Sequence, residues 1–345
     1  MSGRGDVRAA SAAAKGCADQ EMKNRKSSES NRSYLKALVA RSNGDVFELE
    51  DYAATGMSGE RMAVLTVDST RNLPFGSELM MLPDRVPILF HTGKKRFEAV
   101  AENPLKPGQP VYPVAAFNSP GYVVTGICAY AERPKAGWLP LFSYGAVGWH
   151  RNRFRSAVFQ VDRERRQDLR LMKKAAVRAG IHRKREQMPE NRLRQHLEKC
   201  ALTYACPAGK NFFLGRYEAP LPTSRRCNAG CLGCISLQYN PSVPCTQQRI
   251  DFTPTPEEIS EVALSHIRKV PRGVVSFGQG CEGEPLTAAD VIEPAIRRVR
   301  AATSRGTIHL NTNGSRPDLL QKLFDAGLDS VRVSLNSVQE RYYNG

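Results

Sequence analysis

The sequence predicts an α/β fold, in which a partial parallel β/α barrel follows a β-rich N-terminal module. After residue 254, signals for helix starts alternate with short apolar runs at the spacing that repeated β/α units have. Between about residues 45 and 161, runs of β-branched and aromatic residues are instead separated by clusters of Gly, Pro and Asn. The length of 345 residues suggests about two domains.

We divide the chain into four segments on these grounds. They are a flexible basic leader (1–40), a β-rich accessory module (41–161), a basic helical connector (162–210) and a partial barrel that is incomplete at its C-terminus (211–345). Five short runs predict the strands of the accessory module, which we expect to be a small barrel or sandwich. These runs are 46–49, 62–67, 86–90, 122–127 and 157–161.

The connector is predicted from a change to helical periodicity. Apolar residues recur there at spacings of three and four, at Leu169, Met172, Ala176, Leu193 and Leu197. Gly180 and Pro189 are expected to break the helix into pieces. Residues 151–200 carry 16 basic and 6 acidic side chains, so this stretch holds a net +10 of the whole chain's +16.

The parallel part is predicted from four helix starts that share one pattern. A Thr or Ser is followed three residues later by an acid, so that its hydroxyl can accept a free N–H of the first helical turn. The pairs are Thr255 with Glu258, Thr287 with Asp290, Ser315 with Asp318 and Ser337 with Glu340. The strands expected before the last three starts are 273–277, 307–310 and 330–335.

The helix predicted to start at Ser337 can be only short, because the sequence stops at Gly345. Only 111 residues follow Cys234, which at roughly 30 residues per β/α unit makes fewer than four units. We therefore expect a fragment, truncated inside its fourth unit.

Composition narrows the class of protein. The sequence has no apolar run of about 18 residues, so we expect no membrane association through a spanning helix. The first 35 residues lack the continuous apolar stretch of a secretory signal. An odd count of nine Cys then favours a reducing, cytoplasmic location and metal or redox chemistry over disulfides.

The sharpest feature is a short loop with three cysteines, Cys227, Cys231 and Cys234, in a C-x3-C-x2-C spacing. Such a loop can wrap three corners of a [4Fe-4S] cluster and leave the fourth iron open for a small ligand. Two arginines directly before Cys227 favour thiolate and cluster charge. A zinc site with Cys245 as the fourth ligand is the alternative that we weigh against the cluster.

This loop is followed in order by Gly283-Glu284-Pro285, Asn311-Thr312-Asn313-Gly314 and Ser334-Leu335-Asn336. Together these motifs resemble the radical S-adenosylmethionine (radical SAM) superfamily over about residues 215–345, and the predicted barrel is then of the radical SAM type. The resemblance implies that Cys227, Cys231 and Cys234 bind one [4Fe-4S] cluster, whose open iron chelates S-adenosyl-L-methionine (SAM).

The resemblance also implies an activity. A donor such as flavodoxin or ferredoxin supplies one electron, SAM is cleaved to a 5′-deoxyadenosyl radical, and the radical abstracts hydrogen from an unidentified substrate. Gly283 and Glu284 are then expected at the methionine amino group, Asn313 in the pocket, and Ser334 and Asn336 at the ribose. No catalytic residue is assigned.

Two departures from the family pattern stand out. Gly233 occupies the position before the third Cys, where the superfamily commonly has an aromatic residue. The motifs expected on a fifth and a sixth strand are missing, so the chain as given is expected to lack part of its pocket and to be inactive if those parts are required.

Three alternatives stay open. His196, Cys200 and Cys206, with Cys245 or Cys281, are candidates for a second cluster, although we favour buried apolar thiols. The basic stretch is a candidate surface for nucleic acid, which we do not favour because aromatics are few there. The rival function is a non-catalytic or degenerate iron–sulfur or nucleic-acid-binding protein.

Overall fold

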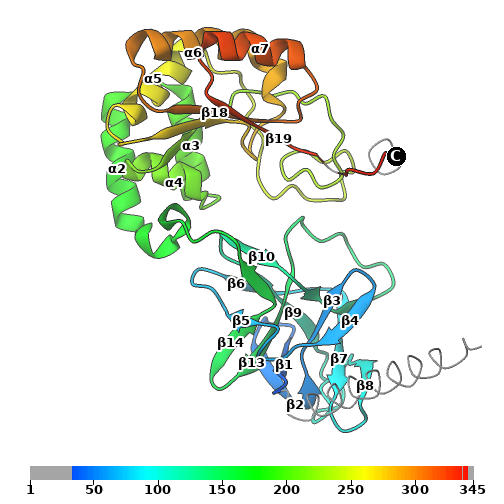
Figure 1. Ribbon diagram of the computed structural model, residues 1–345. Helices are drawn as coiled ribbons and strands as arrows, with labels where there is room; N and C mark the ends of the chain where they lie inside the picture. Colours follow the sequence, from blue (N-terminus) through cyan, green and yellow to red (C-terminus); the bar gives the residue numbers. More distant parts are fainter. Residues whose placement is uncertain (1–32, 336, 341–345) are drawn as a thin grey trace, which may run out of the picture. The chain divides into compact units, whose positions relative to one another are not determined.

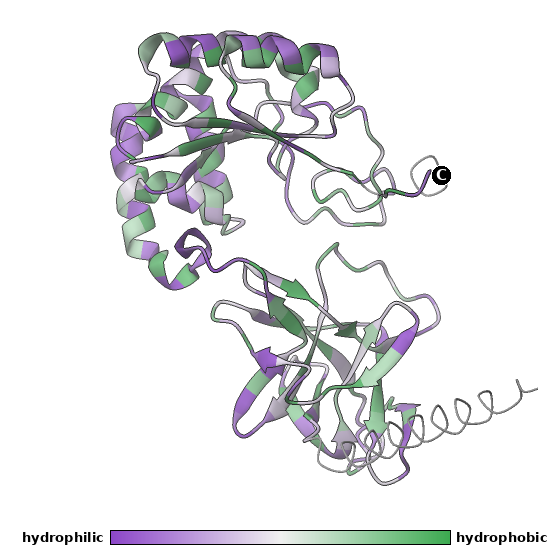
Figure 2. Cartoon of the chain, viewed as in Figure 1, coloured by the Kyte–Doolittle hydropathy of each residue, from purple (hydrophilic) through white to green (hydrophobic). Residues whose placement is uncertain are grey.

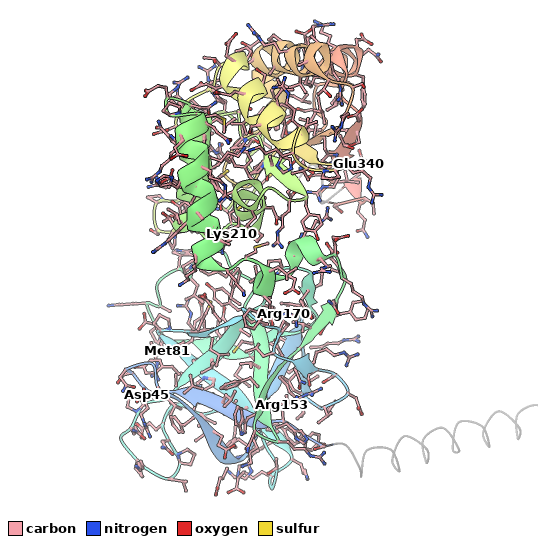
Figure 3. The ribbon with its side chains drawn as sticks, turned by 90° about the vertical axis from the view of Figure 1, so that its left-hand side faces the viewer. Asp45, Met81, Arg153, Arg170, Lys210 and Glu340 are labelled. Carbon is pink, nitrogen blue, oxygen red and sulfur yellow. The ribbon has the colours of Figure 1, made fainter. Side chains whose placement is uncertain are left out.

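The computed structural model describes residues 33–335 and 337–340, and the chain divides into two compact units (Figure 1). The first unit contains the described residues up to Ala136 together with Ser143–Val161. The second contains Gly137–Phe142 and the residues from Asp162 onward. Each unit has a hydrophobic core of its own. In Figure 3, Met81 marks the strands of the first unit and Lys210 marks helix α4 of the second.

The first unit is built from short antiparallel strands, and each of the five predicted runs overlaps at least one of them. Thirteen strands form one sheet, whose central path runs β12-β7-β2-β1-β9-β13-β11-β3-β4, while β10 pairs with β15 separately. The strands are β1 (Lys36–Ala40), β2 (Val46–Ala53), β3 (Thr55–Ser58), β4 (Arg61–Val64), β5 (Arg71–Asn72), β6 (Glu78–Met81), β7 (Arg85–His91), β8 (Arg96–Ala99), β9 (Tyr112–Phe117), β10 (Tyr122–Val124), β11 (Ile127–Cys128), β12 (Tyr130–Glu132), β13 (Gly145–His150), β14 (Arg153–Ser156) and β15 (Val158–Gln160).

Strand β1 shows how this sheet is stabilised. Its side chains alternate between two cores, as the two-residue period of a strand requires. Ala37 and Val39 belong to a core with Leu49 and Val111. The intervening Leu38 and Ala40 belong to another, with Val114 and Val147. Because β1 is buried on both faces, it reads as a continuous apolar run rather than an alternating one.

The predicted fold class is wrong for this chain. The large antiparallel sheet dominates the structure, and the parallel part is a sheet of only four strands rather than a partial barrel. The expected number of about four units agrees with the four strands, but the spacing of β/α units does not fix how far the sheet curves or how large the preceding antiparallel sheet is. The leader predicted over 1–40 falls on undescribed residues as far as residue 32, and β1 begins at Lys36.

The second unit combines the parallel sheet with six α-helices among the described residues. The sheet order is β16 (Glu218–Pro220), β17 (Val274–Phe277), β18 (Thr307–Thr312) and β19 (Ser330–Val333), with every pair parallel. Figure 2 shows hydrophobic residues along these strands and many hydrophilic ones on the helices. The helices are α2 (Lys174–Gln187), α3 (Arg192–Leu202), α4 (Pro207–Leu214), α5 (Pro256–Ile267), α6 (Ala289–Ala302) and α7 (Pro317–Ala326). One core joins residues from all ten elements except β19, whose Val331 packs against it.

Gly180 does not break the helix, contrary to the prediction. It lies inside α2, where an added Cβ would stand 2.0 Å from the Phe213 carbonyl oxygen. The glycine therefore permits close packing of α2 on α4, and the lost helix propensity is the smaller effect. Pro189 does lie between α2 and α3, as predicted.

The four predicted helix starts have different outcomes. Thr255 caps α5 in a full capping box with Glu258, as predicted. Thr287 and Ser315 do not cap α6 and α7, because their hydroxyls bind groups near the cysteine loop instead. The helix expected after Ser337 falls largely outside the described residues.

Among the residues that the structure describes, no helix combines the length and the hydropathy that a membrane crossing requires.

Candidate functional site

The cysteine loop lies beyond the carboxyl end of β16, in a long stretch without regular secondary structure that continues to α5. Cys231 is exposed, Cys227 and Cys234 are half-buried, and all three are free thiols. In parallel sheets, the loops beyond the carboxyl ends of neighbouring strands meet at one edge. The loop is therefore placed where the motifs that follow β17, β18 and β19 also lie.

Backbone hydrogen bonds join the start of this loop to the Gly283-Glu284 motif. The Gly283 N–H donates to the Ser224 carbonyl oxygen at 2.7 Å, and the Glu284 N–H donates to that of Arg226 at 2.8 Å. An added Cβ on Gly283 would stand 1.9 Å from the Arg226 oxygen, so only glycine permits this approach. The motif thus lies directly beside the residue that precedes Cys227.

Glu284 joins two strand ends. Its Oε2 accepts the Asn313 N–H at 2.8 Å, and its Oε1 accepts the Thr312 hydroxyl and the Leu286 N–H. The side chain is buried, with 5% of its surface exposed. Because a carboxylate oxygen has two lone pairs, Oε2 retains one acceptor position beyond the hydrogen bond from Asn313.

Asn313 connects the third strand to the cysteine loop. Its side-chain amide donates to the Asn228 side-chain oxygen at 2.9 Å, and the Asn228 amide donates to the Ser315 hydroxyl at 2.8 Å. The structure therefore brings together Gly283, Glu284, Asn313 and the first cysteine of the loop, which are far apart in the sequence.

Of the residues predicted on the last strand, only Ser334 is described. It directly follows β19, and its N–H donates to the Thr312 carbonyl oxygen at 2.8 Å. This bond extends the pairing of β18 and β19 by one residue. Asn336 lies outside the described residues.

Glu282 organises the site, although the sequence analysis did not single it out. Its fully buried carboxylate accepts four backbone N–H groups, from Thr223, Ser224, Gly278 and Gln279, at 2.7 to 2.9 Å. Burial raises the pKa of Glu282 to about 7, while these four donors act in the opposite direction. In the sequence, Glu282 is marked only by its position directly before the Gly283-Glu284 motif. That position does not show whether its carboxylate is buried and bonded to the backbone or exposed to solvent.

Cys234 has the electrostatic surroundings of a thiolate. The Arg249 guanidinium donates to its Sγ at 3.4 Å. Burial acts to raise the pKa of the Cys234 thiol, but the backbone N–H groups of Ser236 and Leu237 and the charge of Arg249 outweigh it, and the pKa is lowered. Three accessible cysteines, one of them held in this way, are a donor set that fits three corners of an iron–sulfur cluster.

A second cysteine group lies deeper in the same unit. His196, Cys200 and Cys281 place one nitrogen and two sulfur atoms within 4.8 Å of one another. Both thiols are buried and free. The Cys281 thiol and His196 lower the pKa of Cys200. Of the cysteines considered with His196 and Cys200 in the sequence, Cys281, from the loop after β17, is the one that lies within this distance.

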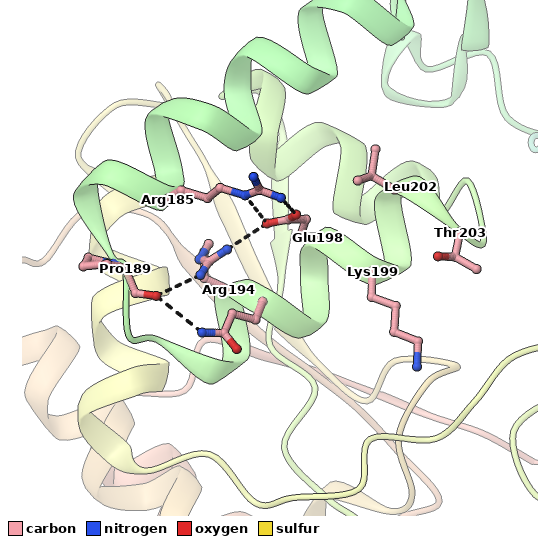
Figure 4. Close-up of a pocket in the computed structure, with 8 residues that line it drawn as sticks. Arg185, Pro189, Arg194, Glu198, Lys199, Leu202 and Thr203 are labelled. Carbon is pink, nitrogen blue, oxygen red and sulfur yellow. Dashed lines mark hydrogen bonds and ion pairs between the residues drawn. The ribbon is translucent and has the colours of Figure 1, made fainter.

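The basic connector uses part of its charge internally. Arg185 and Arg194 line a hollow of about 510 Å³ together with Glu198. Figure 4 shows that both arginines bind Glu198. Lys184 is buried against Ser265 and the Phe212 ring, and burial lowers its pKa to about 8. Several of the basic residues counted in the sequence are therefore structural rather than free to bind a polyanion.

Comparison with known proteins identifies one family. Residues 221–344 match the family model described as the radical SAM superfamily, which confirms the resemblance seen in the motifs. The match supports an enzyme of this superfamily and, in general terms, its iron–sulfur cluster and SAM. A search of curated proteins finds no match.

Proposed function

We propose that this chain, through its radical SAM domain at residues 221–344, is an enzyme that binds one [4Fe-4S] cluster through Cys227, Cys231 and Cys234. SAM binds beside the cluster at the carboxyl edge of the parallel sheet. These cysteines would hold the cluster, which in its reduced form would supply the one electron that splits SAM into methionine and a 5′-deoxyadenosyl radical, for hydrogen abstraction from a substrate still to be identified.

One observation carries the proposal: the hydrogen bonds from Gly283 and Glu284 to Ser224 and Arg226. They fix the motif expected at the SAM amino group directly beside the loop expected to hold the cluster. Without them, the cysteine motif and the Gly-Glu motif would be two separate sequence patterns. Their contact supports a single site.

The side chains at this edge have distinct roles. The free acceptor position on Glu284 suits the ammonium group of the methionine part of SAM, because a carboxylate and an ammonium form a charge-assisted hydrogen bond. Gly283 leaves room for the close backbone approach. Asn313, Ser334 and Asn336 supply hydroxyl and amide groups for the ribose and the rest of the pocket. Arg249 keeps Cys234 ready to act as a thiolate ligand.

The test uses the full chain, reconstituted with iron and sulfide without oxygen and reduced with dithionite in the presence of SAM. The expected product is 5′-deoxyadenosine, measured by mass spectrometry, together with a cluster EPR signal that changes when SAM is added. Cys231→Ala should abolish both readouts. The matched control is Cys245→Ala, because Cys245 is also an exposed free thiol but lies outside the motif.

A protein with a full cluster that yields no 5′-deoxyadenosine and shows no EPR change would favour the rival function, a non-catalytic or degenerate iron–sulfur or nucleic-acid-binding protein. Binding to RNA should then be present and weaken steeply with salt. We do not favour that reading, because Arg185, Arg194 and Lys184 have partners within the fold. The physiological electron donor is proposed to be a carrier such as flavodoxin or ferredoxin.

A further inference from the structure

The group formed by His196, Cys200 and Cys281 has no role in the proposed radical chemistry. His196 and Cys200 lie one helical turn apart on α3, so both side chains project from the same face. Cys281 comes from the loop after β17, 81 positions further along the chain than Cys200. Their three ligand atoms lie within 4.8 Å of one another.

This spacing is compatible with a single metal ion. With zinc–sulfur bonds of about 2.3 Å and zinc–nitrogen bonds of about 2.0 Å, neighbouring ligand atoms on a tetrahedral zinc stand roughly 3.5 to 3.8 Å apart. The His196 Nε2 to Cys200 Sγ distance is 3.4 Å. The cysteines of a cubane cluster each bind a different iron, so their sulfurs are separated by an iron–iron edge and two outward bonds. Three atoms gathered around one point therefore fit an ion better than a second cluster.

The surroundings also fit a bound ion. The backbone N–H of Cys206 donates to the Cys200 carbonyl oxygen at 3.1 Å, and the Ile250 N–H donates to that of Cys281 at 2.8 Å, so both ligand backbones are held. The His196 ring packs edge-on against Phe252, with 6.4 Å between the ring centroids.

A cavity borders the group on the side of His196. This cavity, of about 370 Å³, is lined by His196, Lys199, Tyr204 and Arg249, among others. Its wall therefore includes one of the three ligands, while Cys200 and Cys281 are covered by protein.

We propose that His196, Cys200 and Cys281 form a second metal site, which binds one zinc-type divalent ion and is separate from the cysteine loop. Two thiolates and one imidazole are ligands that zinc prefers, and three protein ligands leave the fourth tetrahedral position to water or another small ligand. The ion links α3 to the loop that carries Gly283 and Glu284, because Cys281 precedes Gly283 by two residues.

The test uses the full-length chain with Cys227, Cys231 and Cys234 all changed to Ala, so that the cysteine loop cannot bind metal. Titration of the reduced, metal-free protein with Co²⁺ should give one ion per chain, a thiolate-to-cobalt charge-transfer band and the visible absorption of a tetrahedral ion. Zn²⁺ should displace the cobalt. This outcome does not depend on the proposed SAM chemistry, so the two proposals can fail separately.

Two further changes in that background identify the ligands. His196→Gln and Cys281→Ser should each weaken Zn²⁺ binding by at least about 100-fold, the upper end of what loss of an outer-shell partner costs. Matched controls are Cys245→Ser, an exposed thiol, and Cys128→Ser, a buried thiol of the first unit; both should leave binding unchanged. His196 is half-buried, so His196→Gln gives a usable result even if Cys281→Ser fails to fold.

Two results would overturn the proposal. One is the absence of the charge-transfer band, or a band that both His196→Gln and Cys281→Ser leave intact. The other is about four irons with matching sulfide per chain after reconstitution of the triple-alanine protein, since this would assign the group to a second iron–sulfur cluster.

Discussion

The helices that pack on the parallel sheet and the loops at its carboxyl edge are stabilised by different interactions. On the helical side, α5 and α6 bury apolar residues such as Ile259, Val262 and Ile292, and a capping box begins α5. At the carboxyl edge, the loops are held instead by buried polar groups, above all Glu282 and Glu284, and by close backbone contacts at glycine. The difference implies that changes on the helical side should affect stability, whereas changes at the carboxyl edge should first affect the proposed binding of the cluster and SAM.

The largest effect is expected from removing the three cysteines proposed to bind the cluster. Changing Cys227, Cys231 and Cys234 to Ala should abolish iron incorporation at the loop and SAM cleavage. The Tm should move by no more than about 3 °C, because the loop has no regular structure and its thiols contribute little to a core. Iron analysis, product formation and thermal unfolding of the same sample make the check. A large loss of Tm would show that the loop is also structural.

Gly283→Ala is at the carboxyl edge, but it should lower both the stability of the fold and the binding of iron. The new Cβ would stand 1.9 Å from the Arg226 oxygen, so the two loops must move apart. We expect a loss of about 3 kcal/mol or more in unfolding free energy, together with reduced iron incorporation. Gly233→Ala is the control, since its Cβ would meet no atom within 4 Å and it should be near neutral. Urea unfolding measures both, and a neutral Gly283→Ala would contradict the packing described above.

On the helical side, pH should act through His266 of α5. The ring is fully buried, and burial lowers its pKa to about 4 from the ordinary 6.5. Below pH 6.5 the unfolded chain takes up a proton that the folded chain does not, so the unfolding free energy falls as pH falls from 6.5 to 4. This contribution amounts to roughly 2.5 kcal/mol between pH 7.5 and 4.5.

The measurement is urea unfolding of the wild type and of His266→Phe at both pH values. The variant should lose that part of the pH dependence. His182→Gln is the control, because His182 is exposed on α2, and it should behave as the wild type does. Equal pH dependence in all three proteins would show that His266 is not the titrating group.

The smallest effects are expected from two threonines that share one sequence pattern. Thr255 caps α5, so Thr255→Ala should cost about 1 kcal/mol and leave SAM cleavage unchanged. The Thr287 hydroxyl instead contacts the Arg226 carbonyl oxygen and the Ser224 hydroxyl. Thr287→Ala should therefore cost a similar amount in stability but also lower iron retention. If the two variants had the same iron content, the contrast between the two sides would not hold for these residues.

These threonines also show what could be predicted from the sequence. The strands at 273–277, 307–310 and 330–335 were predicted correctly because apolar runs and their spacing are local signals. The predicted helix caps at Thr287 and Ser315 were wrong, because a hydroxyl that can hydrogen-bond to the first turn of a helix can equally hydrogen-bond to a neighbouring loop. Which of the two it binds depends on a contact between segments about 60 to 90 residues apart.

The residues of the candidate site likewise fall into those that local motifs predict and those that they do not. The three-cysteine motif and the Gly-Glu motif each lie within a short segment of the sequence, so the site residues could be proposed from them. Glu282 and the pairing of Cys200 with Cys281 depend on how loops from different strands meet, and no local pattern encodes that. The four parallel strands agree with the expected number of units, but the fold class was wrong for a related reason, since unit spacing carries no information about sheet curvature or about the size of the antiparallel sheet in the other unit.

The four N–H groups held by Glu282 have a consequence for solvent exchange. The amide protons of Thr223, Ser224, Gly278 and Gln279 sit on two different loops, yet all four donate to one carboxylate. An opening that releases one of them must move the acceptor of the other three or pull a loop away from it. We expect these amides to exchange with deuterium at closely similar rates and with similar opening free energies, so that the two loops behave as one cooperative unit.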